Sequence, residues 1–378
     1  EAYAFASCPE CARHAAEHGR NHLYADHIRD LAAPLLARGI RPGIWCDMVL
    51  HYPDQMRDIP RDFVIWDWNY WSDNRPNPVT RAWGQGLITR DQVTPALRAT
   101  YPTIVDADGN LVPFYTTDFL KNAGFDVMLC SSSRSHGDSV FCPDFDVHTR
   151  NVVGVAQKTA QTGILGQCVT SWAVRLNPWE TQDWILRLAP RALRHPDRPA
   201  AELLAEVAAE QAGGDPAPIL KALRALGQGF PCAGAGSTGI QWSRGKDSLP
   251  APAHYLADRI AAWKRDQPAE WTALREKLHA VSTAFPAALG DLATALQRTD
   301  RGLDALEPWL TAGGFQVQQA RLATLILDEK RDPALIPWIE TLKSRYADWL
   351  ADTGQTPLSA RQNAGLVYDC LIEYLRPA

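Results

Sequence analysis

Residues 43–48 read GIWCDM, a short apolar run that begins after a turn and ends in tryptophan, cysteine and aspartate. The helical pattern at 23–38 and the break at Gly39 lead directly into the strand expected at 41–48. Three further strand-like runs of the same kind follow, at 62–68, 125–131 and 164–172. Helical patterns precede the last two, at 118–123 and 147–162. This alternation predicts parallel strands joined by helices.

Four βα units of this kind predict an α/β fold that forms about half of a (β/α)8 barrel, over residues 1–190. A doubly wound open sheet is the alternative, but no glycine-rich phosphate loop follows any of the strands. Half a barrel leaves two unpaired edges, so we expect the missing half to precede this chain, which starts without methionine. The long segment 72–117, with its turn clusters, is expected to be a lid.

From about Pro190 the composition becomes rich in Ala, Leu, Arg and Glu with a helical period, which predicts an all-helical domain over 191–378. Its main helical runs are expected at 254–265, 270–285, 287–299, 302–312, 316–327, 333–352 and 360–375. Five tryptophans follow the helical period and are expected to be core residues: Trp263, Trp271, Trp309, Trp338 and Trp349.

The net charge of −5 and the scattered basic residues argue against a nucleic-acid partner. No run of about 18 apolar residues is present, so no membrane association is expected. The eight cysteines do not form a dense disulfide framework, which favours a reduced, cytoplasmic protein while leaving localisation and oligomeric state open. No cofactor is expected.

Tryptophan is unusually frequent, with 14 in 378 residues, and six lie at or just after strand-like runs, at 45, 66, 68, 71, 172 and 179. In (β/α)8 enzymes the chemistry lies where the strands end, and aromatic rings beside carboxylates suit sugars. The candidate binding residues at these ends are Trp45, Asp47, Trp66, Trp68, Tyr70, Trp172 and Arg175. Each could instead pack outward against helices; we favour sugar binding for Trp45 and Trp172, and leave Trp66 against Trp68 open.

Carboxylates for acid–base chemistry are harder to choose, because spacing singles out none of Asp47, Asp67, Asp73, Asp118 and Glu180. Asp118 is most simply the cap of the helix that it precedes.

The start of the chain offers Cys8 and Cys11, followed by His14, His18 and His22. Cysteine and histidine at such spacings can bind zinc, but the second cysteine pair of a zinc ribbon is missing. No βαβ pattern precedes the two cysteines, as a thioredoxin-like motif would require. We therefore expect no metal site.

Taken in order, these motifs resemble the second half of a family 20 glycoside hydrolase, closest to the intracellular type of β-N-acetylhexosaminidase. The resemblance covers residues 1 to about 190 and rests on the segments 1–3, 24–28, 44–48, 66–70, 131–133 and 163–172. It implies that Glu1 is the general acid, that an aspartate precedes it, and that the substrate's own 2-acetamido group is the nucleophile. It also implies that Trp45, Trp172 and one of Trp66 and Trp68 wall the sugar pocket.

By the same resemblance, Asp47, Tyr70 and Arg175 contact sugar hydroxyl or acetyl groups. The expected activity is that of a retaining, exo-acting β-N-acetylhexosaminidase that removes terminal N-acetylhexosamine. The third strand departs from the family, because serines at 131–133 stand where many members have tyrosine and aspartate. Two alternatives stay open: a non-catalytic carbohydrate-binding protein on a barrel scaffold, and a barrel glycosidase with two protein carboxylates. This chain alone is expected to be a poor enzyme.

Overall fold

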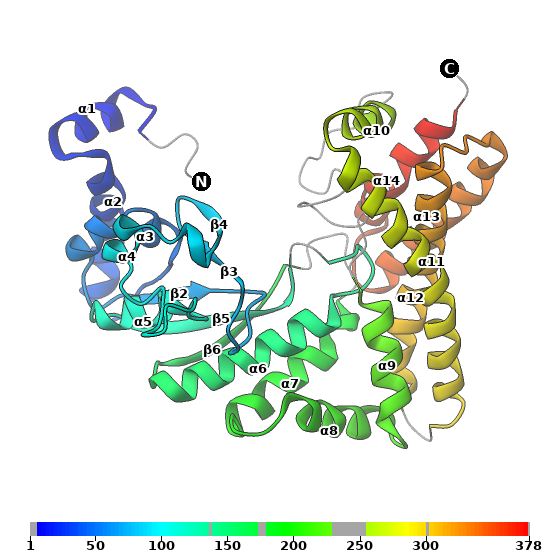
Figure 1. Cartoon of the computed structure of the whole chain (residues 1–378), viewed down its shortest axis with the longest axis horizontal. Helices are drawn as coiled ribbons and strands as arrows, with labels where there is room; N and C mark the ends of the chain where they lie inside the picture. The colour runs from blue at the N-terminus through cyan, green and yellow to red at the C-terminus, as the bar shows by residue number, and fades with distance from the viewer. Residues whose placement is uncertain (1–5, 136–137, 173–178, 229–254, 300–301, 377–378) are drawn as a thin grey trace. The chain divides into compact units, whose positions relative to one another are not determined.

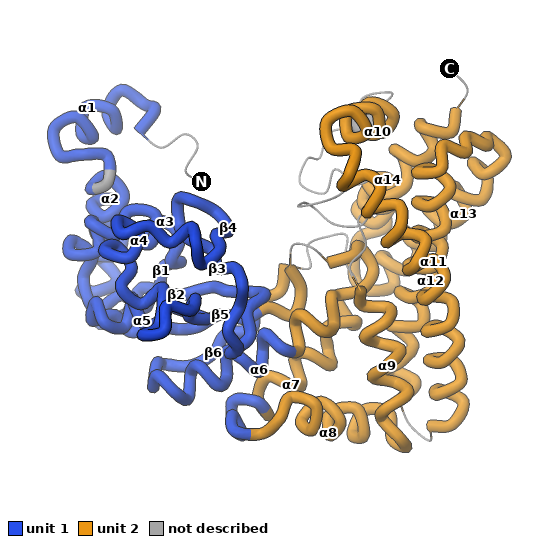
Figure 2. Tube along the Cα trace, viewed as in Figure 1, with its two compact units in different colours: residues 1–131, 150–169, 192–197 blue, residues 132–149, 170–191, 198–378 orange. Residues whose placement is uncertain are grey.

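The computed structural model describes residues 6–135, 138–172, 179–228, 255–299 and 302–376. Two compact units make up the chain (Figure 2). Unit 1 comprises residues 1–131, 150–169 and 192–197, and unit 2 comprises residues 132–149, 170–191 and 198–378. The strand β5 and the helices α6 and α7 each run from one unit into the other, so the chain passes between the units several times.

A four-stranded sheet in the order β1-β2-β5-β6 forms the centre of the first part of the chain (Figure 1). Its strands are β1 (Gly43–Trp45), β2 (Val64–Trp68), β5 (Asp126–Arg134) and β6 (Gly166–Ser171). The strands β1 and β2 are parallel, with Trp45 paired to Trp66, and β2 and β5 are parallel, with Trp68 paired to Cys130.

Helices alternate with these strands, because parallel neighbours need a crossover connection. They are α1 (Pro9–His18), α2 (Arg20–Leu36), α3 (Asp47–His51), the 3-10 helix η1 (Pro53–Asp58), α5 (Tyr115–Asn122) and α6 (Phe145–Thr162). The predicted mixed α/β fold, a parallel four-stranded sheet with alternating helices followed by an all-helical region, is confirmed.

The first strand is shorter than the sequence predicts. It ends at Trp45, because Cys46 adopts a helical backbone conformation and α3 begins at Asp47. A strand over 41–48 would place Trp45 and Asp47 on one face, and this expectation is wrong, since Asp47 belongs to a helix.

The core of unit 1 is built from apolar residues of the helices and of every second strand position. Ala25 of α2, Ile65 of β2, Leu120 of α5 and Val127 of β5 are all buried in it. Trp66, the neighbour of Ile65 in the strand, lies on the other face of the sheet, over β1. A Cβ atom on Gly43 would come within 2.4 Å of its Nε1, so only glycine fits there.

The segment 72–117, expected to be a lid, is a folded part of unit 1. It contains the antiparallel hairpin β3 (Val79–Ala82) and β4 (Gly86–Thr89), the short η2 (Arg90–Gln92) and α4 (Pro95–Thr100). Ala82, Ile88, Leu97 and Tyr101 from this segment belong to the buried core. The turn clusters therefore mark loops of a packed subdomain.

The loop that follows β2 is fixed to α6 by two features. The side-chain amide of Asn151 donates to the backbone oxygens of Asn69 and Ser72, both at 2.8 Å. One turn further along α6, Gly154 lies against the backbone of Asp73, leaving no room for a side chain.

Unit 2 is mostly helical after α7 (Asp183–Arg194), which contains residue 190. The division expected at that residue stays a prediction. The later helices are α8 (Ala200–Ala212), α9 (Pro216–Leu226), α10 (Tyr255–Asp266), α11 (Pro268–Leu296), α12 (Leu303–Leu327), α13 (Ile336–Asp352) and α14 (Pro357–Leu375). The short 3-10 helices η3 (Glu180–Gln182) and η4 (Pro333–Leu335) precede α7 and α13. None of the helices in the described part of the chain is both long and apolar enough to cross a membrane.

Two breaks expected inside this region are absent, because packing keeps the helices continuous. The helix α11 runs through Pro286, and α12 runs through Gly313, whose missing side chain lets Leu226 and Leu289 approach closely. Trp271 and Trp309 are buried, as expected of core residues. Trp263, Trp338 and Trp349 are half-buried.

Candidate functional site

The carboxyl ends of β1 and β2 present an exposed aromatic pair. Trp45, the last residue of β1, keeps 44% of its surface accessible although it lies in a sheet. Its ring meets that of Trp66 edge to face, with centroids 5.7 Å apart and planes at 64°. An indole held at a fixed angle by a second indole offers a rigid apolar surface of the kind that a sugar ring stacks on.

Asp47 lies just beyond this pair and is anchored by Trp68. The indole Nε1 of Trp68 donates to the Asp47 Oδ2 at 2.9 Å. Tyr70 stacks on Trp68, with centroids 5.0 Å apart and planes at 23°. Three of the predicted site residues, Asp47, Trp68 and Tyr70, therefore form one group, while Trp45 and Trp66 form a second beside it along the same two strands.

Three residues that the sequence did not single out as site residues extend this group. Trp71 and Trp83 meet Trp68 edge to face, at centroid distances of 6.0 and 5.2 Å. The guanidinium carbon of Arg81 lies 5.1 Å from the Trp71 ring and 5.7 Å from the Trp68 ring. We call Trp68, Tyr70, Trp71, Arg81 and Trp83 the aromatic cluster.

Arg81 lies in β3 and Trp83 in the turn that follows it, so these two residues reach the cluster through a hairpin and not through a strand end of the parallel sheet.

Asp67 is a strand-end carboxylate that does not face the aromatic residues. It is buried on the opposite side of β2, where the hydroxyls of Thr116 and Thr117 donate to it at 2.7 to 3.1 Å. Burial raises the pKa of Asp67, and the hydrogen bonds from the two threonines offset this only in part. Its role is to fix α5 to the sheet.

Asp118 does not cap a helix, contrary to expectation. The helix α5 starts at Tyr115 and has Phe114 as its N-cap, so Asp118 lies within the first turn. Its carboxylate accepts from Lys158 of α6 at 2.6 Å, which joins two helices of unit 1. This ion pair explains why the charged side chain of Lys158 can be buried.

The remaining predicted residues lie elsewhere or outside the described residues. Trp172, which is 51% exposed, follows β6 in unit 2. Glu1 and Arg175 lie outside the described residues.

The three serines of β5 are buried, and their side chains form hydrogen bonds to other side chains of the protein. Ser131 accepts from Gln167 at 3.0 Å, and Ser133 donates to Gln182 at 2.8 Å.

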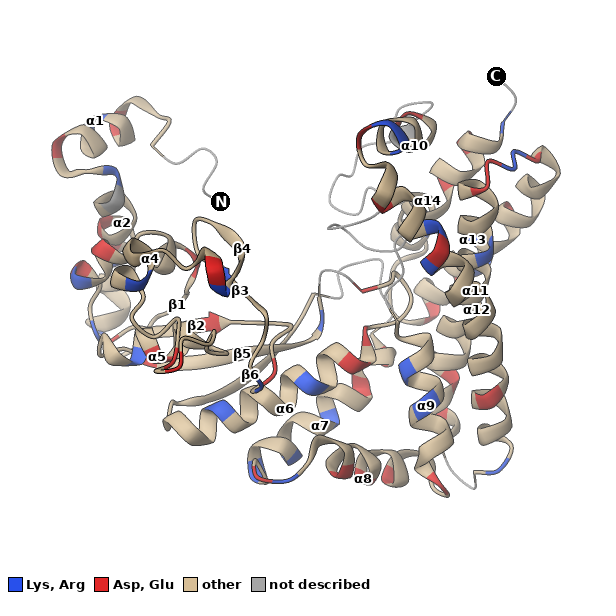
Figure 3. Ribbon diagram, viewed as in Figure 1, with Lys and Arg blue, Asp and Glu red and all other residues tan. Residues whose placement is uncertain are grey.

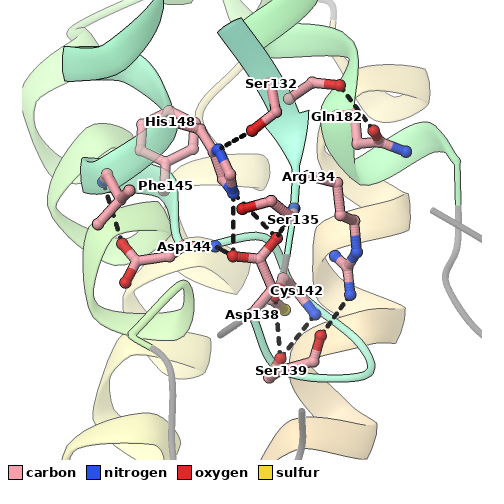
Figure 4. A network of polar contacts seen from close by, with 12 residues as sticks. Ser132, Arg134, Ser135, Asp138, Ser139, Cys142, Asp144, Phe145, His148 and Gln182 are labelled. Atoms are coloured by element: carbon pink, nitrogen blue, oxygen red, sulfur yellow. Dashed lines mark hydrogen bonds and ion pairs between the residues drawn. The ribbon is translucent and has the colours of Figure 1, made fainter. Parts of the chain in front are cut away.

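Ser132, which lies between these two serines in β5, belongs to a polar network at the start of unit 2 (Figure 4). Its Oγ lies 3.1 Å from Nδ1 of His148, and the Nε2 of that ring lies 2.9 and 3.0 Å from the two carboxylate oxygens of Asp138. The hydrogen bonds run from serine to histidine to aspartate, as they do in a hydrolase triad. However, Ser132 and His148 have no exposed surface, and Asp138 also accepts from the backbone N–H groups of Ser135 and Asp144. The network therefore closes the β5–α6 connection.

Possible metal ligands at the start of the chain are engaged with one another. His14 pairs with Asp26 at 3.2 Å, and His22 pairs with Asp58 at 2.8 Å. Among the described residues, no group of three or more His, Cys, Asp or Glu side chains is placed to hold a metal ion. Lysines and arginines are interspersed with aspartates and glutamates along the ribbon of both units (Figure 3).

No protein-family model matches the chain, and no curated protein is similar enough to it to count as a match. What the molecule does is therefore inferred from its own residues and their geometry.

Proposed function

We propose that the chain binds a carbohydrate at the carboxyl ends of β1 and β2, and that it forms half of the (β/α)8 barrel of a family 20 type glycoside hydrolase. The observation that carries the proposal is the exposed Trp45, held by Trp66 beside the anchored carboxylate of Asp47. A ring face for the C–H side of a sugar and an acceptor for its hydroxyls are the two groups that sugar recognition requires.

The geometry of Asp47 supports a role in hydroxyl binding. Trp68 donates to its Oδ2, and within the described residues the other carboxylate oxygen accepts no hydrogen bond. Asp47 is only half-buried, so this oxygen can accept from a bound hydroxyl group. Because the Trp68 indole fixes the carboxylate, little side-chain entropy is lost when a sugar binds.

The proposed reaction is the removal of a terminal N-acetylhexosamine with retention. Glu1 protonates the leaving oxygen, and the substrate's acetamido oxygen attacks the anomeric carbon to give a cyclic intermediate that water then opens. Trp45 walls the sugar, and Tyr70 contacts its polar groups. These roles follow the family resemblance of the sequence.

A second candidate is sugar binding without N-acetyl selectivity or without turnover. The observation that favours it is the inward bonding of Ser131, Ser132 and Ser133, at the strand end where many family members place acetamido contacts. Inhibitors distinguish a barrel glycosidase with two protein carboxylates from both of these candidates. Thiazoline mimics of the acetamido intermediate inhibit only the substrate-assisted reaction.

Replacing Trp45 with alanine is expected to raise the dissociation constant for N-acetylglucosamine oligomers at least about tenfold, roughly 1.4 kcal/mol, because the stacking face is lost. Isothermal titration of the purified chain measures the change. Trp338→Ala, which removes a half-buried indole from α13, is the matched control and is expected to bind as the unmodified chain does. Equal affinity in the Trp45 variant and the control would reject the site.

Turnover is tested on a chain extended upstream to include the residue before Glu1. Release of nitrophenol from a nitrophenyl N-acetyl-β-glucosaminide is compared with that of its Glu1→Gln variant. Loss of activity in the variant supports the general acid, and equal activity excludes it. Binding without any release of nitrophenol supports the non-catalytic candidate.

A further inference from the structure

The helix α1 starts with two cysteines in a defined geometry. Cys8 is the N-cap residue, with φ −77° and ψ 153°, and Pro9 begins the helix. The backbone N–H of Cys11 donates to the Cys8 sulfur, with N and S 3.2 Å apart. The sulfur of Cys8 thus takes the place of the oxygen that usually caps a helix, next to the free N–H groups of its first turn.

The two cysteines are coupled through the Cys8 sulfur. Hydrogen bonding from the side chain and from the backbone N–H of Cys11 lowers the pKa of Cys8, whereas burial and the charge of Glu10 oppose this shift. Donating to Cys8 correspondingly raises the pKa of Cys11. One sulfur is therefore prepared as a thiolate, and the other is kept protonated beside it.

Cys8 is more accessible than any other cysteine that the structure describes. Cys8 is exposed and Cys11 is half-buried, whereas Cys46, Cys130, Cys142 and Cys370 are buried. A second thiol pair, Cys168 with Cys130, offers an internal comparison, since the hydrogen bond from Cys130 lowers the pKa of Cys168 to about 7. Its partner sulfur lies inside the sheet and away from any helix N-terminus.

We propose that Cys8 and Cys11 form a redox-active dithiol that exchanges with low-molecular-weight disulfides of the glutathione class. The Cys8 thiolate attacks one sulfur of the disulfide, which forms a mixed disulfide and releases the first thiol. Cys11 then loses its proton and attacks the Cys8 sulfur, which forms the Cys8–Cys11 disulfide and releases the second thiol. Two thiols of the protein are oxidised as one disulfide is reduced, and the reverse reaction uses the same atoms.

The position of Cys8 just outside the helix favours closure of this disulfide. Cβ atoms three apart within a helix lie about 5–6 Å apart and a disulfide holds them about 3.5–4.5 Å apart, so the backbone at the N-cap must move by roughly 1–2 Å. The sugar site proposed above is not involved, so this activity stands or falls independently of it.

Oxidation of the full chain by oxidised glutathione, followed by alkylation and peptide mapping, tests the proposal. The fragment that ends at Arg13 contains both cysteines and no others. We expect it to lose the mass of two hydrogen atoms before any other cysteine reacts. In Cys11→Ser, Cys8 is expected to retain a glutathionyl group, because the resolving thiol is missing. In Cys8→Ser, which keeps a capping side chain, Cys11 is expected to react roughly tenfold more slowly.

The rate of Cys8 alkylation against pH provides a second measurement that does not depend on oxidation. Cys11→Ala removes the side-chain donor to the Cys8 sulfur and leaves the backbone donor, so the midpoint of the profile is expected to move to higher pH. Cys11→Ser keeps a hydroxyl donor and is expected to hold the midpoint low. The proposal is overturned if the Cys130–Cys168 pair is oxidised first, or if the three profiles coincide.

Discussion

Replacing Asp138 with alanine is expected to lower the free energy of unfolding by roughly 3–5 kcal/mol. The carboxylate is 6% exposed and accepts from Nε2 of His148 and from the backbone N–H groups of Ser135 and Asp144. Without it, the buried His148 ring loses its partner at Nε2, and so do two partly buried backbone N–H groups.

The measurement is urea-induced unfolding, followed by fluorescence and by circular dichroism. Asp146→Ala is the matched control, because this carboxylate lies on α6, the helix that contains His148, but is exposed, with an ion pair to Arg224 at 3.1 Å. An exposed pair is worth about 0–1 kcal/mol. Similar losses in the two variants would show that the network is not what stabilises the β5–α6 connection.

The contribution of Asp138 depends on pH in a defined direction. Burial alone would raise its pKa, but the attraction of His148 and Arg134 and the hydrogen bonds outweigh burial and leave the pKa below its usual value. A group with a lowered folded pKa stabilises the fold above its unfolded pKa, about 3.9 for aspartate, and that stability is lost as the pH falls further. The difference between the unmodified chain and Asp138→Ala is therefore expected to shrink progressively below about pH 4.

Replacing Gly154 with alanine is expected to destabilise the protein by roughly 1–3 kcal/mol, although alanine is the better helix former. The added Cβ would lie 2.7 Å from the Cα of Asp73 and 2.8 Å from the backbone nitrogen of Asn74. These are backbone atoms that Asn151 holds in place, so the loop must separate from α6 to make room. Hydrogen exchange over residues 69–74 should accelerate in this variant.

Gly290→Ala makes the same chemical change inside α11 and has the opposite expected sign. A Cβ atom at Gly290 meets nothing within 4 Å, so only the helix propensity changes, by about 0.5–1 kcal/mol in favour of the fold. Comparing the two urea midpoints separates close packing from propensity. Stabilisation by both variants would contradict the contact between α6 and the loop.

The sheet was predictable because buried parallel strands are continuous apolar runs. Three of the four runs contain an observed strand, and the run 125–131 covers the first part of β5, which extends to Arg134. Element ends were harder, since a few residues decide them. Asp47 looks like a strand residue in sequence, but a single helical φ,ψ pair at Cys46 places it in α3. Pro286 and Gly313 resemble helix breaks, yet packing between α9, α11 and α12 keeps both helices continuous.

Part of the candidate site was predictable from the positions of the strand ends along the chain. Trp45, Asp47, Trp66, Trp68 and Tyr70 were named from that order. The hydrogen bond from Trp68 to Asp47 is a tertiary contact that sequence spacing does not encode. The same is true of the contact between Arg81, which lies on a hairpin, and the rings of Trp68 and Trp71. The same holds for Asp138 and His148, whose separation of ten residues crosses a loop and an irregular helix start.

The aromatic cluster also determines how this molecule responds to light. The Trp68 ring has Trp83 at 5.2 Å and Trp71 at 6.0 Å, distances at which excited indoles pass energy to one another and their ultraviolet transitions mix. Light absorbed by any one of these three rings can therefore be emitted by another. Circular dichroism near the indole bands contains a coupled signal that has nothing to do with helix content. A ligand that disturbs any one of the rings would change the optical signature of all of them.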